Sequence, residues 1–385
     1  MIPYSTQIIT KKDKIQVSKV LNSKLITQGD ILKKFENNLA KKTGSKFATG
    51  FNSATSALHV SCMALGLNKG DILWTCTNSF VASANCGLYC GAKVELIDIN
   101  QENFNININD LEKKLKVAKI KKKLPKILIP IHFGGMPCEM KKIHQLSKKY
   151  KFKIIEDASH ALGAKYRNDK IGSCKYSDIT VFSFHPLKII TTAEGGAALS
   201  NSKKIDQQLK ILRNHGITRN KKLFKIKKTI PWYYEFQKLG FNYRLNEIQS
   251  ALGISQLNNL NKWIKHRHKL ANIYRKELRD LPIYIPEEKK NFYSSNHLFV
   301  VMIKRNKKKI NRDDVYEYLR KKKIQTNVHY IPIHSHPYYK KLGFKEKNFP
   351  QMKEYYKSCL SLPMYAGLSE KKQRTVIKAL RKCFL

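Results

Sequence analysis

The sequence has no apolar run that approaches the roughly 18 residues a membrane-spanning helix needs. It is also poor in acid, because 28 Asp and Glu residues stand against 74 Lys and Arg residues, which gives a formal net charge of +46. Residues 1–7 do not show the charged start and apolar stretch of a secretory signal. We therefore expect a cytoplasmic protein that neither crosses nor binds a membrane.

The eight cysteines show no paired CxxC spacing, so the sequence indicates neither a disulfide framework nor a cysteine zinc site. Their apolar surroundings are typical of buried, reduced thiols. His329, His334 and His336 form the main histidine cluster, but no cysteine or carboxylate completes a recognised zinc spacing. We expect no metal, and we expect these histidines to line a polar pocket.

An excess of positive charge is typical of proteins that bind nucleic acid. The lysines, however, are spread along the chain in short runs, such as residues 121–123, 307–309 and 321–323, without a basic tail or a nucleic-acid-binding motif. We therefore expect no nucleic-acid partner. A small acidic substrate, such as a nucleotide sugar, would still be attracted by the field.

Helix and strand patterns alternate over about the first 155 residues. Residues 53–65 have apolar side chains at helical spacing, with Asn52 or Ser53 as the cap. Short apolar runs predict strands at residues 72–75, 94–98, 126–131, 153–155 and 179–182. This alternation predicts an α/β fold, in which a mostly parallel central sheet is covered by helices on both faces, as a three-layer large domain.

The chain of 385 residues is longer than one typical domain. A long helical pattern over residues 246–281 predicts a connecting helix. Beyond it, strands at residues 297–303 and 324–330 and helices at residues 313–322 and 370–380 predict a small α+β C-terminal domain. We place the large domain at residues 1–255 and the small one at residues 256–385.

One lysine and one carboxylate follow predicted strands. Lys188 lies between the strand at residues 179–182 and a Gly-Gly corner, in apolar company that favours a desolvated, nucleophilic amine. Asp157 follows the strand at residues 153–155, whereas Glu156 points to the opposite face. A lysine that forms an imine and a carboxylate that keeps a ring nitrogen protonated are what a pyridoxal phosphate enzyme needs. The alternatives are a surface lysine and a helix-capping aspartate.

Other residues fit the same cofactor. Residues 53–56 start a helix with small hydroxyl side chains, which suits a phosphate, and Ser183 adds another hydroxyl. Phe80 is placed to stack on the ring and His160 to pack near it, although both also suit ordinary core packing. Because ligands collect at the carboxyl ends of parallel strands, we expect Asp157, Ser183 and Lys188 to converge on one crevice.

Taken together, several motifs resemble the sugar-nucleotide aminotransferase family (DegT/StrS type) of fold-type I pyridoxal phosphate enzymes. They occur in the family's order from about Tyr4 to the C-terminus: NSATSA at 52–57, EDASH at 156–160, SFHPLK at 183–188, EGG at 194–196 and GFNYRLN at 240–246. Within the family, the segments NSKLITQG at 22–29, ITTAEGG at 190–196 and VHYIP at 328–332 are most similar to the 4-aminotransferases of pseudaminic acid biosynthesis.

The resemblance implies a role for each matching residue. Lys188 would be the Schiff-base lysine, Asp157 the partner of the ring nitrogen and Phe80 the stacking aromatic. Ala54, Thr55 and Ser183 would cradle the phosphate. Asn242 would reach the neighbouring subunit's cofactor across a homodimer with shared active sites. The nucleotide sugar would contact Tyr4, Lys24, Leu25, Ile26, Thr27, Ala54, Arg244, Asn327, Val328, His329 and Tyr330. Residues 76–79 differ from the corresponding segment of relatives, which often contains proline. This difference concerns the loop before Phe80 and therefore the expected contact between Phe80 and the ring.

The implied reaction transfers an amino group from L-glutamate to C4 of a UDP-linked 4-keto-6-deoxy-N-acetylhexosamine. One alternative is a transaminase or dehydratase for another nucleotide-linked keto sugar; the family's dehydratases place histidine where this chain has Lys188. A second alternative, from another class, is a basic nucleic-acid-binding protein, which would show salt-sensitive retention on DNA or RNA and no cofactor.

Overall fold

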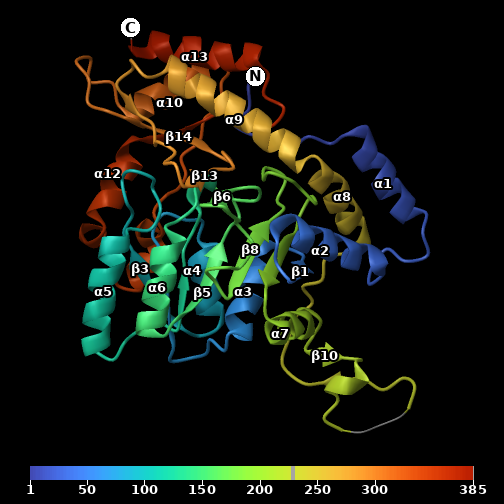
Figure 1. Ribbon diagram of the computed structural model, residues 1–385. Coiled ribbons are helices and arrows are strands. Elements are labelled where there is room, and N and C mark those ends of the chain that lie inside the picture. The colour runs from blue at the N-terminus through green and yellow to red at the C-terminus, as the bar shows by residue number, and fades with distance from the viewer. Residues whose placement is uncertain (227–229, 385) are drawn as a thin grey trace.

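A seven-stranded sheet forms the centre of the larger part of the molecule. The computed structural model describes residues 1–226 and 230–384, and within them the strand order is β1-β9-β8-β5-β4-β2-β3 (Figure 1). The strands are β1 (Phe47–Phe51), β2 (Ile72–Cys76), β3 (Lys93–Ile97), β4 (Ile127–Ile129), β5 (Lys153–Asp157), β8 (Ile179–Ser183) and β9 (Gly196–Ser200). β9 runs antiparallel to β1 and β8, and the pairs from β8 to β3 are parallel. The predicted mostly parallel sheet is confirmed.

Helices cover both faces of this sheet. Alternate residues of each strand enter different cores: Ile127 and Ile129 of β4 pack with α3, α4 and α7, whereas Leu128 packs with the helices of the other face. The first layer contains α3 (Ala54–Ala64), α4 (Ala82–Tyr89) and α7 (Lys203–Arg213). The second contains α2 (Asp30–Thr43), α5 (Ile108–Ile120), α6 (Met140–Tyr150) and α8 (Glu247–Asn258), with α1 (Lys11–Leu21) packed on α8. The fold is the expected three-layer α/β arrangement.

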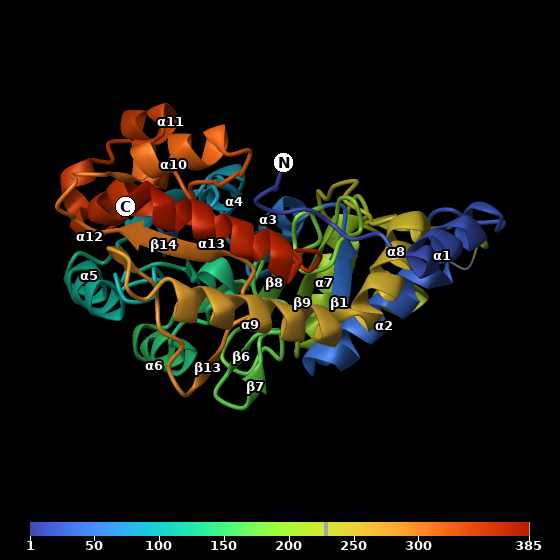
Figure 2. The ribbon, with the colours of Figure 1, turned by 90° about the horizontal axis from the view of Figure 1, so that it is seen from above.

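A second, smaller core lies beside the first. Its antiparallel sheet has the order β12-β14-β15, formed by Ile283–Tyr284, Phe299–Ile303 and Cys359–Leu362. The α9, α10 and α13 helices pack on it (Figure 2). They span Leu260–Glu277, Arg312–Lys321 and Glu370–Phe384, and α11 (Pro337–Lys341) and α12 (Pro350–Ser358) lie between α10 and β15 in the chain. Because α9 contributes Leu260 to the first core and Leu270 to the second, the boundary placed between residues 255 and 256 stays a prediction.

The shorter elements form two further small sheets. β6 (Lys165–Tyr166), β7 (Asp169–Lys170) and β13 (Phe292–Tyr293) form a small sheet, and β10 (Ile217–Thr218) pairs with β11 (Glu235–Phe236) in a hairpin that extends from the body of the molecule (Figure 1). Short 3₁₀ turns occur at Phe133–Gly135, Lys221–Leu223, Ile333–Ser335 and Glu346–Asn348.

Two expectations were wrong in detail. The helical pattern over residues 246–281 forms two helices, α8 and α9, because the chain turns at Asn259 between them. The strand predicted at residues 324–330 is wrong, since this described segment makes only isolated bridges, from Ile324 to Ile2 and from Asn327 to Ser361. On one side this segment neighbours the N-terminal residues, and on the other side it neighbours β15. Each neighbour forms only one bridge with it.

The N-terminal segment is tied to the smaller core. The Ile2 amide donates to Lys323 O and Ile2 O accepts from the Gln325 amide, both at 2.8 Å. The Met364 amide then donates to Tyr4 O at 3.0 Å. These bonds bring Tyr4 to the junction of the two cores.

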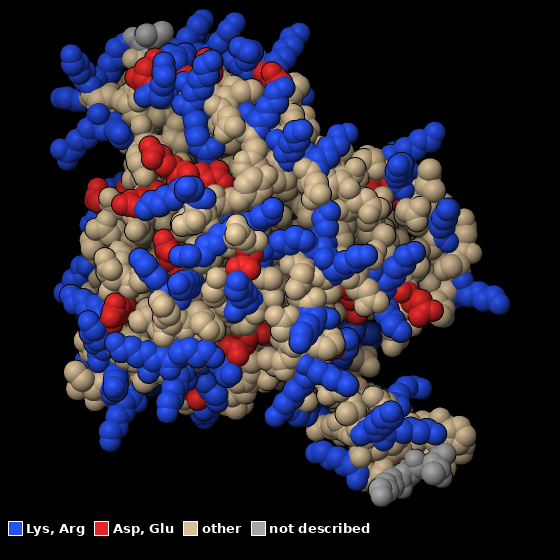
Figure 3. Space-filling view, in the orientation of Figure 1, with Lys and Arg blue, Asp and Glu red and all other residues tan. Residues whose placement is uncertain are grey.

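The face of the molecule seen in Figure 3 is basic without a single basic stripe. Lys and Arg side chains are spread over the whole face seen in Figure 3, with acidic side chains scattered between them. Among the described residues, no helix combines the length and the apolar character that crossing a bilayer requires.

A buried carboxylate at the junction of α8 and α2 provides a test of the fold. Gly29 gives α2 no side-chain cap, and Glu247 instead accepts from the Ile31 and Leu32 amides at 2.7 and 3.3 Å. We expect Glu247→Ala to lower the free energy of unfolding by about 2 kcal/mol, since buried amides lose a charged acceptor. Urea denaturation measures this. The control, exposed Glu354→Ala, should change it by less than about 0.5 kcal/mol; equal losses would contradict the role of Glu247.

Candidate active site

A cavity of about 570 Å³ opens at the carboxyl ends of β5 and β8. This volume is within the range of small-molecule sites, and its place in the sheet is where α/β folds bind ligands. The predicted site residues that line it are Tyr4, Ala54, Thr55, Phe80, Asp157, His160, Ser183, Lys188, Asn327, Val328, His329 and Tyr330. The convergence expected for Asp157, Ser183 and Lys188 is therefore present.

Lys188 lies in the loop of residues 184–195 that joins β8 to β9. The loop is held by the Thr192 amide and the Thr191 hydroxyl, which both donate to Phe184 O at 3.0 Å. Removal of the amine from water lowers the pKa of Lys188 from 10.5 to about 8, although the negative charge of Asp157 opposes this shift. A substantial fraction of this amine is thus neutral and nucleophilic near neutral pH.

Asp157 is held in place by hydrogen bonds to both carboxylate oxygens. The Ser83 hydroxyl donates to Oδ2 at 2.6 Å and the Ser159 amide donates to Oδ1 at 3.0 Å. Ser83 lies in the first turn of α4, and its Oγ is 2.8 Å from Ser79 Oγ. The sequence reasoning missed Ser83, although its place three residues after Phe80, on the same loop and helix, is a signal that links it to the site.

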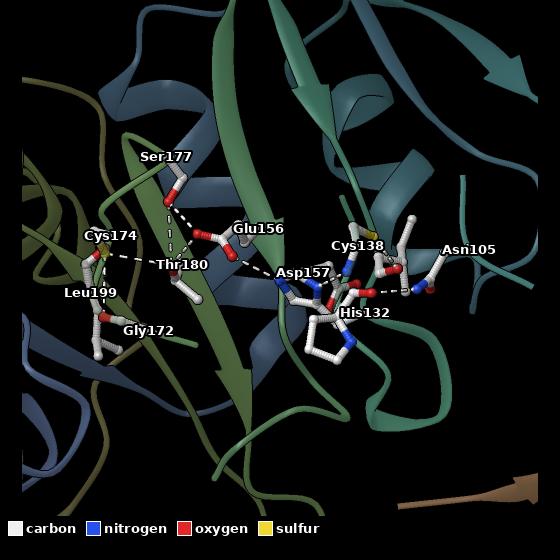
Figure 4. Close-up of polar contacts among 12 residues, drawn as sticks. Asn105, His132, Cys138, Glu156, Asp157, Gly172, Cys174, Ser177, Thr180 and Leu199 are labelled. Carbon is white, nitrogen blue, oxygen red and sulfur yellow. Dashed lines mark hydrogen bonds and ion pairs between the residues drawn. The ribbon is translucent and has the colours of Figure 1, made fainter. Parts of the chain in front are cut away.

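Glu156, the neighbour of Asp157, points away from the cavity into the sheet's other face (Figure 4). Its oxygens contact His132 Nε2 at 2.7 Å, Ser177 Oγ at 2.5 Å and Thr180 Oγ1 at 3.0 Å. Burial by itself would raise the pKa of Glu156, but these hydrogen bonds outweigh it and the pKa lies below its ordinary value. The His132 Nδ1 accepts a hydrogen bond from the Cys138 amide, so the ring proton is on Nε2, which donates a hydrogen bond to Glu156. Glu156 therefore anchors the end of β5.

The start of α3 forms one end of the cavity. Ser53 caps the helix by accepting from the Ser56 amide at 3.0 Å, and the next two amides, of Ala54 and Thr55, have no acceptor within the helix. Gly196 lies so close that a Cβ there would be 2.5 Å from the Ala54 nitrogen. Backbone amides at a helix start, with Ser183 nearby, are the donors that a phosphate group needs, and these residues fit one.

Histidine and tyrosine side chains form the opposite wall. The His160 Nδ1 accepts from the Gly134 amide at 3.2 Å, so its Nε2–H donates to Tyr330 Oη at 3.1 Å and leaves the tyrosine proton free to donate elsewhere. Burial, followed by the charge of Lys188, lowers the pKa of His160, and lowers that of His329 to about 3. Both rings are neutral at physiological pH. His297, which the sequence reasoning missed, packs on His160 with centroids 4.4 Å apart.

Phe80 lies at the edge of the cavity with 61% of its surface exposed, and its ring centroid is 6.4 Å from that of Tyr330. The unusual segment at residues 76–79 is itself buried, and its Thr77 Oγ1 bonds His334 Nδ1 at 2.7 Å. This hydrogen bond holds His334 away from the cavity, whereas His329 and His336 line it. No group of side chains suited to hold a metal ion occurs in residues 1–226 and 230–384.

Some predicted substrate and cofactor residues lie outside the cavity lining. Asn242 forms a bridge with Asn214, and the Arg244 guanidinium donates to the Asn214 side chain at 2.6 Å. Lys24, Leu25, Ile26 and Thr27 form a bend on the surface, where the Ile26 carbonyl accepts from the Glu247 amide. The roles given to these residues stay predictions.

The chain is 36% identical over 377 residues to the UDP-4-amino-4,6-dideoxy-N-acetyl-beta-L-altrosamine transaminase of Campylobacter jejuni, covering 98% of this chain and 96% of that one. The structure of Helicobacter pylori PseC, an aminotransferase involved in the biosynthesis of pseudoaminic acid, superposes with a TM-score of 0.89 at 33% identity, covering 100% and 99% of the two chains.

A putative sugar aminotransferase from Streptococcus pneumoniae, solved in its PLP-form, superposes with a TM-score of 0.89 at 26% identity, covering 99% of this chain and 98% of that one. The profile of one family matches residues 7–381, nearly the whole chain. The resemblance stated from the motifs is thereby confirmed: the chain belongs to the DegT/DnrJ/EryC1/StrS aminotransferase family.

Proposed function

We propose that this protein is a pyridoxal phosphate-dependent transaminase that moves an amino group from L-glutamate to C4 of a UDP-4-keto-6-deoxy-N-acetylhexosamine. Its product would be UDP-4-amino-4,6-dideoxy-N-acetyl-β-L-altrosamine, the compound in the names of the Campylobacter and Helicobacter relatives. The observation that carries the proposal is the pairing of a desolvated lysine with a fixed carboxylate across one cavity. The eight free thiols suit a cytoplasmic enzyme.

The cavity offers a contact for each part of the cofactor. The Ala54 and Thr55 amides and the Ser183 hydroxyl suit the phosphate, Asp157 suits the ring nitrogen, and Phe80 and His160 suit the ring faces. When bound, the cofactor supplies an electron sink for the carbon that loses or gains a proton. Ser83 and Ser159 would hold Asp157 aimed at the ring position, because each donates to one carboxylate oxygen.

Lys188 has two tasks in this proposal. With the cofactor bound, the neutral amine would hold its aldehyde carbon, and after an amino donor has taken that place the amine would move the proton at the donor or sugar carbon. A pKa of about 8 suits both tasks, since the amine both accepts and releases a proton near neutral pH. The low dielectric of the cavity sustains this pKa.

The wall of histidine and tyrosine suits the sugar. Because His329 and His160 are neutral and His160 satisfies the Tyr330 oxygen, the Tyr330 hydroxyl can donate to an uncharged oxygen of the substrate without adding positive charge beside Lys188. Tyr4 and Asn327, which hydrogen-bond each other, stand at the same wall. We assign residues 24–27, Val328 and Arg244 to the nucleotide sugar as well.

We also propose a homodimer that shares its active sites. Apolar side chains are exposed on the β10–β11 hairpin and after it: Trp232 at 73%, Phe236 at 64% and Leu239 at 75%. Exposure of this kind marks a surface that another chain covers. Asn242 follows this segment, and in the dimer it would reach the partner's cofactor, together with Arg244 nearby.

The pKa of Lys188 gives a pH test. Only the neutral amine binds the cofactor aldehyde, so the rate at which apoenzyme regains bound cofactor should rise with pH to a midpoint near 8, not 10.5. Rapid-mixing absorbance spectroscopy between pH 6 and 10 measures this rate. Borohydride should then fix the cofactor on Lys188 in wild-type protein and in exposed Lys357→Ala, and not in Lys188→Ala. A label on another lysine would contradict the proposal.

Substitutions of Asp157 and of Ser83, which donates a hydrogen bond to it, should lower kcat to different extents. Asp157→Asn should lower kcat by about 10²- to 10³-fold, the scale of losing one electrostatic contact to the reacting group. Ser83→Ala should lower it by about tenfold, since one charge-assisted hydrogen bond is lost. The matched control is Ser177→Ala, which removes a similar bond to Glu156 on the other face and should leave kcat within about twofold. Steady-state kinetics decides, and equal effects at Ser83 and Ser177 would refute the assignment.

Substrate choice is tested with UDP-, dTDP- and GDP-linked 4-keto sugars, each incubated with glutamate and analysed by mass spectrometry. We expect an amino sugar from the UDP-linked 4-keto-6-deoxy-N-acetylhexosamine. Turnover of only another nucleotide sugar would overturn the sugar assignment and leave aminotransfer intact. A dehydrated product without nitrogen would instead support the dehydratase alternative.

A further inference from the structure

His297 lines the cavity beside His160, and the reaction described so far gives it no task. Only 4% of its surface is exposed, and neither ring nitrogen has a hydrogen-bond partner in residues 1–226 and 230–384. Of the two nitrogens, only Nδ1 is also sealed from solvent, so Nε2 is the one that is open to the cavity. Because an N–H that is sealed without an acceptor is costly, we place the ring proton on Nε2, where a ligand can accept it.

The backbone on both sides of His297 is fixed, which gives its ring a set position. The Ser295 hydroxyl donates to His160 O at 2.5 Å. The Leu298 amide donates to Gly134 O at 3.1 Å. The His297 ring packs on the His160 ring, with 4.4 Å between the centroids. A donor on a ring that is already held loses little conformational entropy when a ligand binds to it.

A buried arginine of α9 lies behind this ring. The Arg267 Nη1 group donates to the carbonyl oxygens of Asn296 and His297, both at 3.2 Å, and to Met364 O at 3.0 Å. Its Nε has no partner among the described residues. Burial lowers the pKa of Arg267 to about 10, and no nearby carboxylate opposes this shift. The guanidinium is still charged at neutral pH, so a positive charge without a counter-ion lies directly behind His297.

The cavity has few other partners for an anionic group. Lys188 is the only Lys or Arg among the described residues that line it, and the proposed reaction already occupies its amine. Burial lowers the pKa of His297, and nearby positive charges, including those of Lys188 and Arg267, lower it further, so the ring is neutral. His297 therefore provides one free N–H, with a buried positive charge behind it, which suits a carboxylate oxygen.

We propose that His297 Nε2 binds the α-carboxylate of the amino donor and that Arg267 is the positioning residue that supports it. This inference rests on the proposed aminotransferase function. The donor carbon that gives its proton to Lys188 carries this carboxylate, and covalent geometry keeps the carboxylate oxygens about 2.4 Å from that carbon. The α-carboxylate thus has to bind on the wall of the cavity near Lys188, whose charge acts on His297. The keto sugar has no carboxylate and does not need this contact.

The test compares amino donors that differ in one group. L-isoglutamine has an amide in place of the α-carboxylate of L-glutamate. With wild-type holoenzyme we expect kcat/KM for L-glutamate to exceed that for L-isoglutamine by about 100-fold, the scale of a hydrogen bond to a charged group. His297→Phe keeps a ring beside His160 but has no N–H, and it should reduce this preference about tenfold. His297→Gln has an amide N–H of similar reach and should keep the preference within about threefold.

A second readout needs no turnover. Glutarate is a dicarboxylate without an amine, so it binds without reacting, and calorimetry gives its Kd for the holoenzyme. We expect this Kd to rise about tenfold in His297→Phe and to stay within about threefold in His297→Gln. The matched control is His144→Phe, the same substitution at a histidine of α6 that contacts Tyr176 O away from the cavity, and it should change neither readout. The KM for the nucleotide sugar should change less than about threefold in all three variants.

Substitutions of Arg267 test its supporting role, with circular dichroism to confirm that each variant is folded. Arg267→Lys keeps the charge and should retain most of the preference for L-glutamate. Arg267→Met removes the charge and should reduce the preference about threefold or more, because the donor loses the positive charge behind it. If Arg267→Met does not fold, the His297 variants and the Kd of glutarate decide.

The proposal is overturned if His297→Phe and wild type show the same preference for L-glutamate over L-isoglutamine. It is also overturned if folded His297→Phe loses its cofactor, seen by absorbance, since His297 would then serve the cofactor. Either result would leave aminotransfer itself intact. If wild-type holoenzyme makes no amino sugar from any donor, the aminotransferase function and this carboxylate site are both refuted.

Discussion

An amine that is kept out of water, in the same cavity as a carboxylate held by two hydrogen bonds, is the constraint on which this structure depends. Desolvation lowers the pKa of Lys188 to about 8, and the negative charge of Asp157 opposes this shift. The fold must therefore hold both groups at a set separation. It does so by placing Asp157 at the last position of β5 and Lys188 in the braced loop after β8, two adjacent parallel strands.

The residues around this pair act in layers. Ser83 and Ser159 fix Asp157 from the cavity side, and Glu156 with His132 fixes the end of the same strand from the other side. A network in which each buried polar group has its partner is rigid, and rigidity is what lets a site keep an amine and a carboxylate apart. Substitutions in α4 or β5 should thus affect chemistry through position, without touching a substrate.

Sequence reasoning recovered the parts of the site that follow local rules. The strand ends at Asp157 and Ser183, the helix start at Ala54 and the turn at Lys188 all belong to short segments whose pattern or family motif is visible in the chain. The sequence did not indicate Ser83 and His297 as site residues, because their place in the site comes from contacts with residues far away in the chain. The strand expected at residues 324–330 failed for a similar reason: a strand needs a continuous neighbour, and only isolated bridges occur there.

The sequence alone determined the fold class and the family and singled out Lys188 and Asp157 as the candidate reacting side chains, since periodicity, capping and motif order are properties of neighbouring residues. The tertiary structure alone decided how far the pKa of Lys188 falls, which hydroxyl holds Asp157, and that Cys62 meets Cys86 where two helices pack together. These features depend on burial and on distances between segments that are remote along the chain. Desolvation and contact arise from packing, which no local pattern encodes.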